Sequence, residues 1–228
     1  MVKRKAPGFS AKKKRKAPDG PIRNKERTRQ KLIHAVGTVL AQKGYANLSA
    51  VKIASAAKVD RKLIYLYFGS LNSLIECYFI QNDFWGPVYN KDIARLLLRQ
   101  KPLNQRDIMA ILKGQLDNMM DNKAFQKSIQ WEISEKNKLM RKISDARERM
   151  GEELFTFTKD YFTGSRADLR ATLALQIAGI YYLTLHAKVN GSTFCGIDIN
   201  RPEGKRRIEN ALKQIVDDTY SKAGKRAV

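Results

Sequence analysis

The chain has 228 residues, of which 43% are hydrophobic and 29% are charged. A chain of this length and composition can bury a core, which excludes a protein that is disordered throughout. Lysine and arginine number 44 against 22 aspartates and glutamates, so the formal net charge is +22. Such a balance predicts a polyanionic partner, either nucleic acid or an anionic membrane surface.

Few side chains are available for redox chemistry, metal binding or covalent catalysis. The two cysteines, Cys77 and Cys195, cannot form a disulfide framework and indicate a reducing, intracellular setting. There are only two histidines, and no glycine-rich phosphate loop or paired metal-ligand spacing is present. We therefore expect no enzyme, no metal and no cofactor. The chain also lacks a long apolar run and an apolar segment after its basic start, so neither a membrane span nor a secretory signal is expected.

The positive charge is concentrated in the first third of the chain. Residues 1–70 hold 18 lysines and arginines against 3 acids. Residues 1–23 contain two basic clusters and a single aromatic residue, which predicts a disordered tail. Three interpretations of this tail stay open: a solvated appendage, an arm that tracks DNA phosphates, and a nuclear-import signal or membrane tether.

The next residues predict three helices. Apolar residues at helical spacing run from about 24 to 43, and Gly44 follows as a stop. Ser49 is a favourable N-cap for a short helix, Ala50 to about Ala57. Asp60 can cap a third helix, which Gly69 ends. Two short helices joined by about three residues form a helix-turn-helix, here at about 49–68.

The accessible side of this motif carries cations, hydroxyls and phenols. Arginine and lysine can reach base edges or phosphates, and tyrosine hydroxyls can donate to phosphate oxygens. Asp60 is the only acid between Ala46 and Leu74. The alternative is an ordinary helical hairpin whose tyrosines pack in a core. The residues expected at DNA are Ser49, Lys52, Arg61, Lys62, Leu63, Tyr65 and Tyr67.

The same region resembles the tetracycline-repressor (TetR) family of bacterial regulators over roughly residues 25–85. The resemblance implies a three-helix DNA-binding head, a helical body with a pocket for a small inducer, and a homodimer formed by the last two helices. It rests on an ungapped string of matching positions: Leu32-Ile33, Ala35-Val36, Val39-Leu40-Ala41, Gly44-Tyr45, Ser49, Ile53-Ala54, Ala57, Val59, Ile64 to Phe68, Ser70 and Leu74.

The chain departs from the family pattern at the turn and in the second helix of the motif. Lys58 stands where the family usually has glycine, and a left-handed lysine costs about 1 kcal/mol. We therefore expect a slightly different turn. Lys62-Leu63 replaces Gly-Thr, which adds a charge and an apolar surface that could meet a thymine methyl. Gly69 and Leu71 replace proline and lysine, which puts one phosphate contact in doubt.

Residues 71–228 are predicted to be helical throughout. Segments are expected at 71–85, 91–100, 104–122, 123–133 and 135–162, followed by a helix that Ser165 and Asp168 start. Its stretch 171–187 is apolar nearly all round, which indicates a buried helix. The last helix begins at Pro202. The helices at 166–188 and 203–221 are the expected dimer surface, with Leu183 and Leu212 in it, although an intrachain core is equally compatible with the pattern.

A pliant ligand pocket is the second expected site. Five methionines lie between residues 109 and 150, and methionine makes an adaptable, polarizable lining. Ordinary core filling is the alternative. The residues expected in the pocket are Met109, Met119, Met120, Trp131 and Met150.

Together these patterns predict an all-α protein with three parts: a basic tail (1–23), a helix-turn-helix DNA-binding domain (24–70) and a regulatory and dimerisation domain (71–228). The expected function is a sequence-specific, homodimeric transcriptional regulator that binds a double-stranded operator. By resemblance it is a repressor released by a small molecule, in the bacterial cytoplasm at the nucleoid. The alternative is a non-specific basic nucleic-acid-binding protein of architectural or RNA-binding type.

Overall fold

The computed structural model describes residues 21–86 and 90–224, and within these ranges the fold is all-α. Its only β feature there is an isolated bridge between Phe194 and Ile197. The elements are α1 (Pro21–Lys43), the 3₁₀ helix η1 (Tyr45–Asn47), α2 (Ala50–Ala57), α3 (Lys62–Phe68), α4 (Leu71–Asn82), α5 (Lys91–Arg99), α6 (Gln105–Asp121), α7 (Lys123–Ser134), α8 (Lys138–Thr156), α9 (Lys159–Phe162), α10 (Leu169–Asn190) and α11 (Pro202–Gly224).

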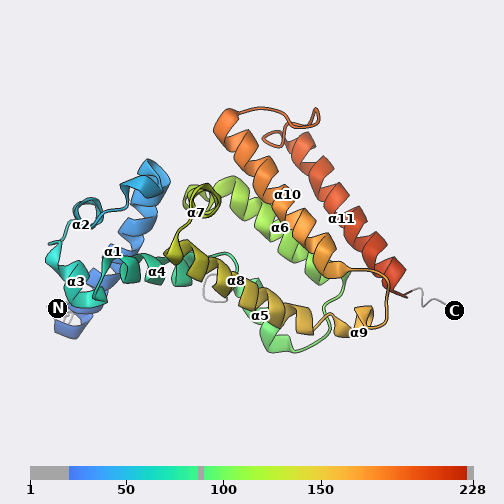
Figure 1. Ribbon diagram of the computed structural model, residues 1–228, viewed down its shortest axis with the longest axis horizontal. Coiled ribbons are helices and arrows are strands. Elements are labelled where there is room, and N and C mark those ends of the chain that lie inside the picture. The colour runs from blue at the N-terminus through green and yellow to red at the C-terminus, as the bar shows by residue number, and fades with distance from the viewer. Residues whose placement is uncertain (1–20, 87–89, 225–228) are drawn as a thin grey trace, which may run out of the picture.

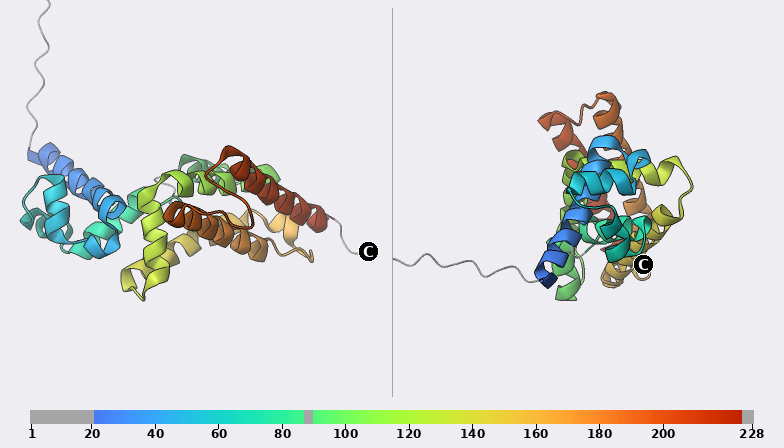
Figure 2. Two further views of the ribbon diagram at one scale, coloured as in Figure 1. Left: turned by 90° about the horizontal axis from the view of Figure 1, so that it is seen from above. Right: turned by 90° about the vertical axis from the view of Figure 1, so that its left-hand side faces the viewer.

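The molecule is elongated, with a small head at one end and a larger body at the other (Figures 1 and 2). We call α1–α3 the head and α5–α11 the body; α4 runs between them. Helix α1 begins at Pro21, three residues before the expected start, because proline suits the first turn of a helix. Most of the predicted basic tail, residues 1–20, lies outside the described residues.

The head is built around a core that α1 shares with the two short helices. Leu32, Leu40, Ile53 and Ile64 are fully buried there. The same cluster also takes in Trp131 of α7 and residues of α8, so head and body are joined by packing as well as by the chain. Burial of these side chains is what fixes the angle of the head on the body.

Helix α4 lies directly against α1. A Cβ atom at Gly37 would lie 2.6 Å from the ring of Tyr78, so the close approach of the two helices depends on this glycine. The helix ends at Asn82, not at the expected Trp85. The reason is Asp83, whose backbone is extended and whose carboxylate accepts the backbone N–H of Trp85.

The body is a layered helical bundle. Helix α6 lies alongside α10 and α11, and α7 lies at the end of α6 nearer the head, as Figure 1 shows. Two buried polar contacts close it: Gln176 Nε2 donates to the carbonyl of Leu212, and the Tyr220 hydroxyl donates to the carbonyl of Leu103, 2.7 Å away. Burial raises the pKa of Tyr220, so this hydroxyl keeps its proton.

Two predicted boundaries in the body are wrong. The segment 135–162 is two helices, because the carbonyl of Phe157 turns aside to accept the N–H of Leu103. Asn137 caps the first of them. The next helix starts at Asp168, whose carboxylate accepts the N–H of Ala171, whereas Ser165 only closes the preceding turn.

The composition of α10 predicted a helix buried on all sides, and this prediction is wrong. One face packs inside the body, and the opposite face exposes Leu175 (77%), Tyr182 (56%) and Val189 (59%). Leu183 is half-buried and Leu212 is 6% exposed, both against the intrachain core. Leu212 is therefore a core residue, whereas Leu183 packs against the core and stays partly exposed.

Within the described ranges no single helix is both long and apolar enough to cross a membrane. Helices α3 and α4 reach that length only when taken together, and they meet at a bend of 65°. No group of three or more metal-ligating side chains occurs in the part of the chain that the structure describes.

Candidate nucleic-acid interface and effector cavity

Helices α2 and α3 begin and end as their capping residues predict. Ser49 Oγ accepts the backbone N–H of Lys52 at 3.3 Å, and Asp60 Oδ1 accepts that of Lys62 at 2.7 Å. Ser49 and Lys52 both lie at the start of α2, and the Lys52 ammonium also donates to the side chain of Asn47. These caps hold α2 and α3 in the geometry of a helix-turn-helix.

The turn between the two helices passes through Lys58. Its backbone has φ 55° and ψ 49°, so the lysine itself takes the left-handed conformation that glycine favours. Its N–H donates to the carbonyl of Ser55, and that of Val59 donates to Ala54. The backbone hydrogen bonds of the turn therefore form with lysine in place of glycine, and the left-handed conformation of Lys58 costs about 1 kcal/mol.

Helix α3 presents a basic and aromatic surface. Arg61 and Lys62 are exposed, neither forms an ion pair within the described residues, and Tyr65 is 51% exposed. Leu63 and Tyr67 instead lie half-buried against the core of the head. The outward apolar position predicted for Leu63 belongs to Leu66, which is 72% exposed. Its spacing of four from Lys62 is the signal that places it on this face.

Arginine 29 of α1 fixes the far end of α3. Its guanidinium donates to the carbonyl of Tyr67 and lies over the ring of Phe68, 4.4 Å from the ring centroid. Lys25, one turn earlier, lies over the ring of Tyr67 at 5.6 Å. Cations at a helix C-terminus satisfy its free carbonyls and its negative dipole end. The start of α1 therefore brings further positive charge beside the exposed helix.

The body encloses a cavity of about 360 Å³ between α6, α8 and α10. Its walls are mainly apolar, with aromatic rings from Trp85, Phe155 and Tyr181. The charged side chains of its lining are the pair Arg147 and Glu132, the pair Arg170 and Glu152, and Glu148. A cavity of this size can hold a small organic molecule.

Arginine 147 of α8 is a nearly buried cation with three partners. It donates through Nε to Asp83 at 2.7 Å and through Nη1 to Glu132, and its guanidinium lies 5.4 Å from the ring centroid of Phe125. Burial by itself lowers the pKa of Arg147, but the carboxylates of Asp83 and Glu132 outweigh it and raise the pKa. Arg147 therefore stays charged and joins α8 to α7 and to the end of α4.

Tyrosine 181 of α10 closes the cavity beside this cluster. Its hydroxyl accepts the indole N–H of Trp85 at 3.0 Å. Burial raises the pKa of Tyr181 to about 12, so the phenol is neutral at physiological pH. Arg147 also lines a second hollow of about 390 Å³ against α4, so it stands between the cavity and the helix that carries the head.

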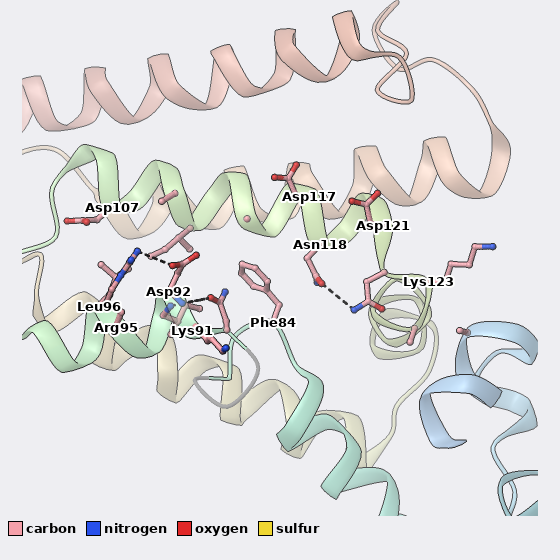
Figure 3. A pocket seen from close by; sticks show the side chains of 18 residues that line it. Phe84, Lys91, Asp92, Arg95, Leu96, Asp107, Asp117, Asn118, Asp121 and Lys123 are labelled. Carbon is pink, nitrogen blue, oxygen red and sulfur yellow. Dashed lines mark hydrogen bonds and ion pairs between the residues drawn. The ribbon is translucent and has the colours of Figure 1, made fainter. Parts of the chain in front are cut away.

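A larger and more open groove of about 940 Å³ lies between α5, α6 and the start of α7 (Figure 3). Its charges are mostly compensated: Asp92 pairs with Arg95, Asp107 with Arg99, and Asp117 with Lys113 and Lys205. Paired charges and an open shape make this groove a weaker candidate for an effector than the enclosed cavity.

The five residues predicted to line a ligand pocket do not come together around any one of the hollows described above. Of the five, only Met150 lines one of these hollows, the one against α4. Met119 is fully buried in the core of the body, where Met109 and Met120 also pack, and Trp131 belongs to the core of the head. Methionine is an effective filler of irregular cores, which is its role here.

Comparison with known proteins finds a family match that lies mainly in the head. Residues 32–76 match the family model of bacterial regulatory proteins of the tetR family. No curated protein matches the chain.

Solved structures resemble the fold over most of its length. The fatty acid degradation regulator FadR from Bacillus halodurans has a TM-score of 0.57 at 16% identity, covering 84% of this chain and 97% of its own. A putative TetR-family regulator from Rhodococcus sp. has a TM-score of 0.58 at 16% identity, with coverages of 85% and 99%. NalD of Pseudomonas aeruginosa, a secondary repressor of a multidrug efflux pump, has a TM-score of 0.58 at 15% identity, with coverages of 85% and 96%.

Proposed function

We propose that this chain, whose residues 32–76 match the tetR family of bacterial regulatory proteins, is a homodimeric, operator-specific repressor in the bacterial cytoplasm. The observation that carries the proposal is the exposed face of α3, where Arg61, Lys62 and Tyr65 stand free beside the basic start of α1. A regulatory and dimerisation domain, residues 71–228, completes the proposed division of the chain.

In this proposal α3 enters the major groove. Arg61, at the start of the helix, reads a base edge, and Lys62 meets a base or a phosphate. Tyr65 donates its hydroxyl to a phosphate oxygen, and the exposed side chain of Leu66 meets a thymine methyl group. Ser49 and Lys52 at the start of α2 contact the backbone, whereas Leu63 and Tyr67 support the helix from behind.

A second copy of the chain is the proposed partner of the exposed face of α10. Leu175, Tyr182 and Val189 recur every seven residues and form one stripe, and Ile215 of α11 is 43% exposed. Gly179 lies within the stripe with open space around it, so another helix can approach closely there. Pairing would join two heads and so two half-sites of a near-palindromic operator.

The cavity around Arg147 is the proposed effector site. A molecule that enters it would press on Arg147, which is bonded to Asp83 at the end of α4. Helix α4 leads directly into the head, so a shift of α4 would change the spacing of two paired heads. The ligand would shift the equilibrium toward the head spacing to which it binds more tightly, and so away from the spacing that fits the operator.

Selection of random duplex DNA on the purified protein tests the proposal. A two-fold symmetric consensus is the expected result, and it should relax at one position in Arg61→Ala, with a loss of about 1–3 kcal/mol in binding. Lys43→Ala, on α1 beyond the proposed interface, is the control for loss of charge alone. Enrichment of no sequence would instead favour the non-specific basic nucleic-acid-binding protein.

A further inference from the structure

Resting on the proposed function of the body cavity, we infer that its effector is a lipophilic cation: an apolar molecule with one ammonium-type group that is held by Glu132. The inference depends on the charge balance of the cavity wall and on which polar atoms are already bonded. It concerns the chemical class of the ligand, which neither the helix-turn-helix nor the fold determines.

The cluster at the inner wall holds one more negative charge than positive charge. Arg147 is shared by two carboxylates, those of Asp83 and Glu132. Asp83 uses both its oxygens, one on Arg147 Nε and the other on the N–H of Trp85. Glu132 bonds Arg147 through Oε2 alone, and its Oε1 has no hydrogen bond within the described residues. Glu132, a residue of the cavity lining, therefore keeps one carboxylate oxygen without a hydrogen-bond partner among the described residues.

In the part of the chain that the structure describes, the cavity lining holds no unpaired cation to balance this charge. The side chains of Asp83 and Arg147 are 8% and 10% exposed, and that of Glu132 is 27% exposed. Arg170, the other cation of the lining, is bonded to Glu152 through both Nη atoms and lies over Phe155. Glu148 adds a further acid at the edge. Glu132 is only partly exposed and shares its single cation with Asp83, so a ligand ammonium can supply the missing counter-charge.

The rest of the wall suits the apolar part of such a ligand. Leucine, isoleucine and alanine side chains of α6, α8 and α10 form most of it. The rings of Trp85 and Tyr181 stand next to the charged cluster, and aromatic faces attract organic cations. Tyr181 is neutral and its oxygen is occupied by the Trp85 indole, so neither ring introduces a competing charge.

An uncharged or anionic ligand is the main alternative. Nη2 of Arg147 has no hydrogen-bond partner and could in principle bind an acceptor oxygen. However, that atom exposes less than 1 Å² and its guanidinium lies over Phe125, so the cavity does not reach it. A carboxylate placed in the cavity would instead lie beside Glu132, where two like charges repel.

Three probes with the same alkyl chain test the inference: decylammonium, 1-decanol and decanoate. Binding to the purified full chain is measured by isothermal titration calorimetry at pH 7, where the amine is charged. Decylammonium should bind about tenfold tighter than 1-decanol, and decanoate should bind weakest. Glu132→Gln should remove the tenfold advantage of decylammonium and leave 1-decanol within about twofold. Glu153→Gln, an exposed acid on α8 away from the cavity, is the matched control and should change neither.

Glu132→Gln removes an excess charge and keeps the Asp83–Arg147 pair, so it should fold with an unchanged circular dichroism spectrum. Decanoate binding as tightly as decylammonium, or a decylammonium preference that survives in Glu132→Gln, would overturn the inference. Operator release by decylammonium is scored separately. Glu132-dependent binding without operator release would support the ligand class and contradict the proposed regulation. Operator release by 1-decanol or decanoate alone would support the proposed regulation and contradict the ligand class.

Discussion

Tyr45 of the head and Trp131 of the body stack with their rings 3° from parallel and their centroids 5.5 Å apart. The Trp131 indole donates to Glu135, and Ser134 donates to the Tyr45 hydroxyl. The neighbour of Trp131 in α7 is Glu132, which lines the body cavity. One helix therefore contacts the head with one residue and the proposed effector site with the next.

Replacing Trp131 by alanine should strongly destabilise the protein. The side chain is 7% exposed in the head core, and loss of a buried tryptophan costs about 3–5 kcal/mol. Urea unfolding followed by circular dichroism measures the change. Trp131→Phe keeps an aromatic ring but loses the bond to Glu135 and part of the buried volume, so it should cost about 1–2 kcal/mol, less than alanine. A loss below 1 kcal/mol in Trp131→Ala would show that the stack does not join head and body.

Charge on the exposed face of α10 should separate the dimer. Leu175 is 77% exposed in one chain, so Leu175→Glu should fold normally but leave a buried charge at the proposed interface. Sedimentation at micromolar concentration should then give a monomer, and operator affinity should fall because the half-sites are no longer linked. Leu98→Glu is the control, since Leu98 is 84% exposed on α5, away from this face. A wild-type monomer with full operator affinity would contradict the proposed pairing.

Asp107 should make stability fall with acid. Burial raises its pKa, but hydrogen bonds from Arg99 and from the N–H of Asn104 outweigh burial and lower the pKa below its ordinary value of about 3.9. A carboxyl with a lowered folded pKa stabilises the protein above the unfolded pKa, and this contribution is lost as pH falls through the folded pKa. Asp107→Asn should therefore cost about 1–2 kcal/mol at pH 7 and progressively less below pH 4. Thermal unfolding from pH 7 to pH 2.5 checks this; a pH-independent difference would exclude the ionised pair as its cause.

Glycine at position 58 should stabilise the head. Lys58 is left-handed at the turn, and removing its Cβ should gain about 0.5–1 kcal/mol after the entropy cost of glycine. Lys52→Gly, inside α2, should instead lose about 1 kcal/mol. Guanidinium unfolding of both variants gives the comparison. Equal losses at the two positions would mean that the turn does not hold Lys58 in this conformation.

Deleting residues 1–20 should reduce the salt dependence of DNA binding. The segment is strongly basic, and each phosphate contact adds roughly 0.9 to the slope of log affinity against log salt. We expect the slope to fall by about two to four per dimer, equally for operator and random DNA, because phosphate contacts carry no sequence information. Fluorescence anisotropy over a range of salt concentrations measures it. An unchanged slope would leave the tail a solvated appendage, and a changed consensus at flanking A·T positions would indicate minor-groove reading.

Local signals predicted the head well. Ser49, Asp60 and Gly69 act on residues next to them in the chain, so their effects are readable from the sequence. The sequence did not show that Leu63 lies inward and Leu66 outward, because a helix of seven residues has too few apolar positions to define its buried face.

The sites in the body depend on contacts between distant residues. Asp83 and Arg147 are 64 positions apart, and no local sequence pattern around either residue predicts that they pair. The methionines predicted a lining but filled a core, since residue type indicates what can pack and not where a space is left. The apolar composition of α10 likewise does not predict which neighbouring helix covers each of its faces.

The bond from Tyr220 to the carbonyl of Leu103 spans 117 positions and lies within the last turns of α11. A ribosome adds about 5–20 residues per second, and the amino-terminal part of a chain folds first. The head is therefore synthesised many seconds before the helix that seals the body. During that interval the nascent chain can carry an exposed α3 without a closed effector cavity or a pairing surface. Under the proposed function, a newly made chain would present its DNA-binding helix before its effector site and its pairing surface are complete.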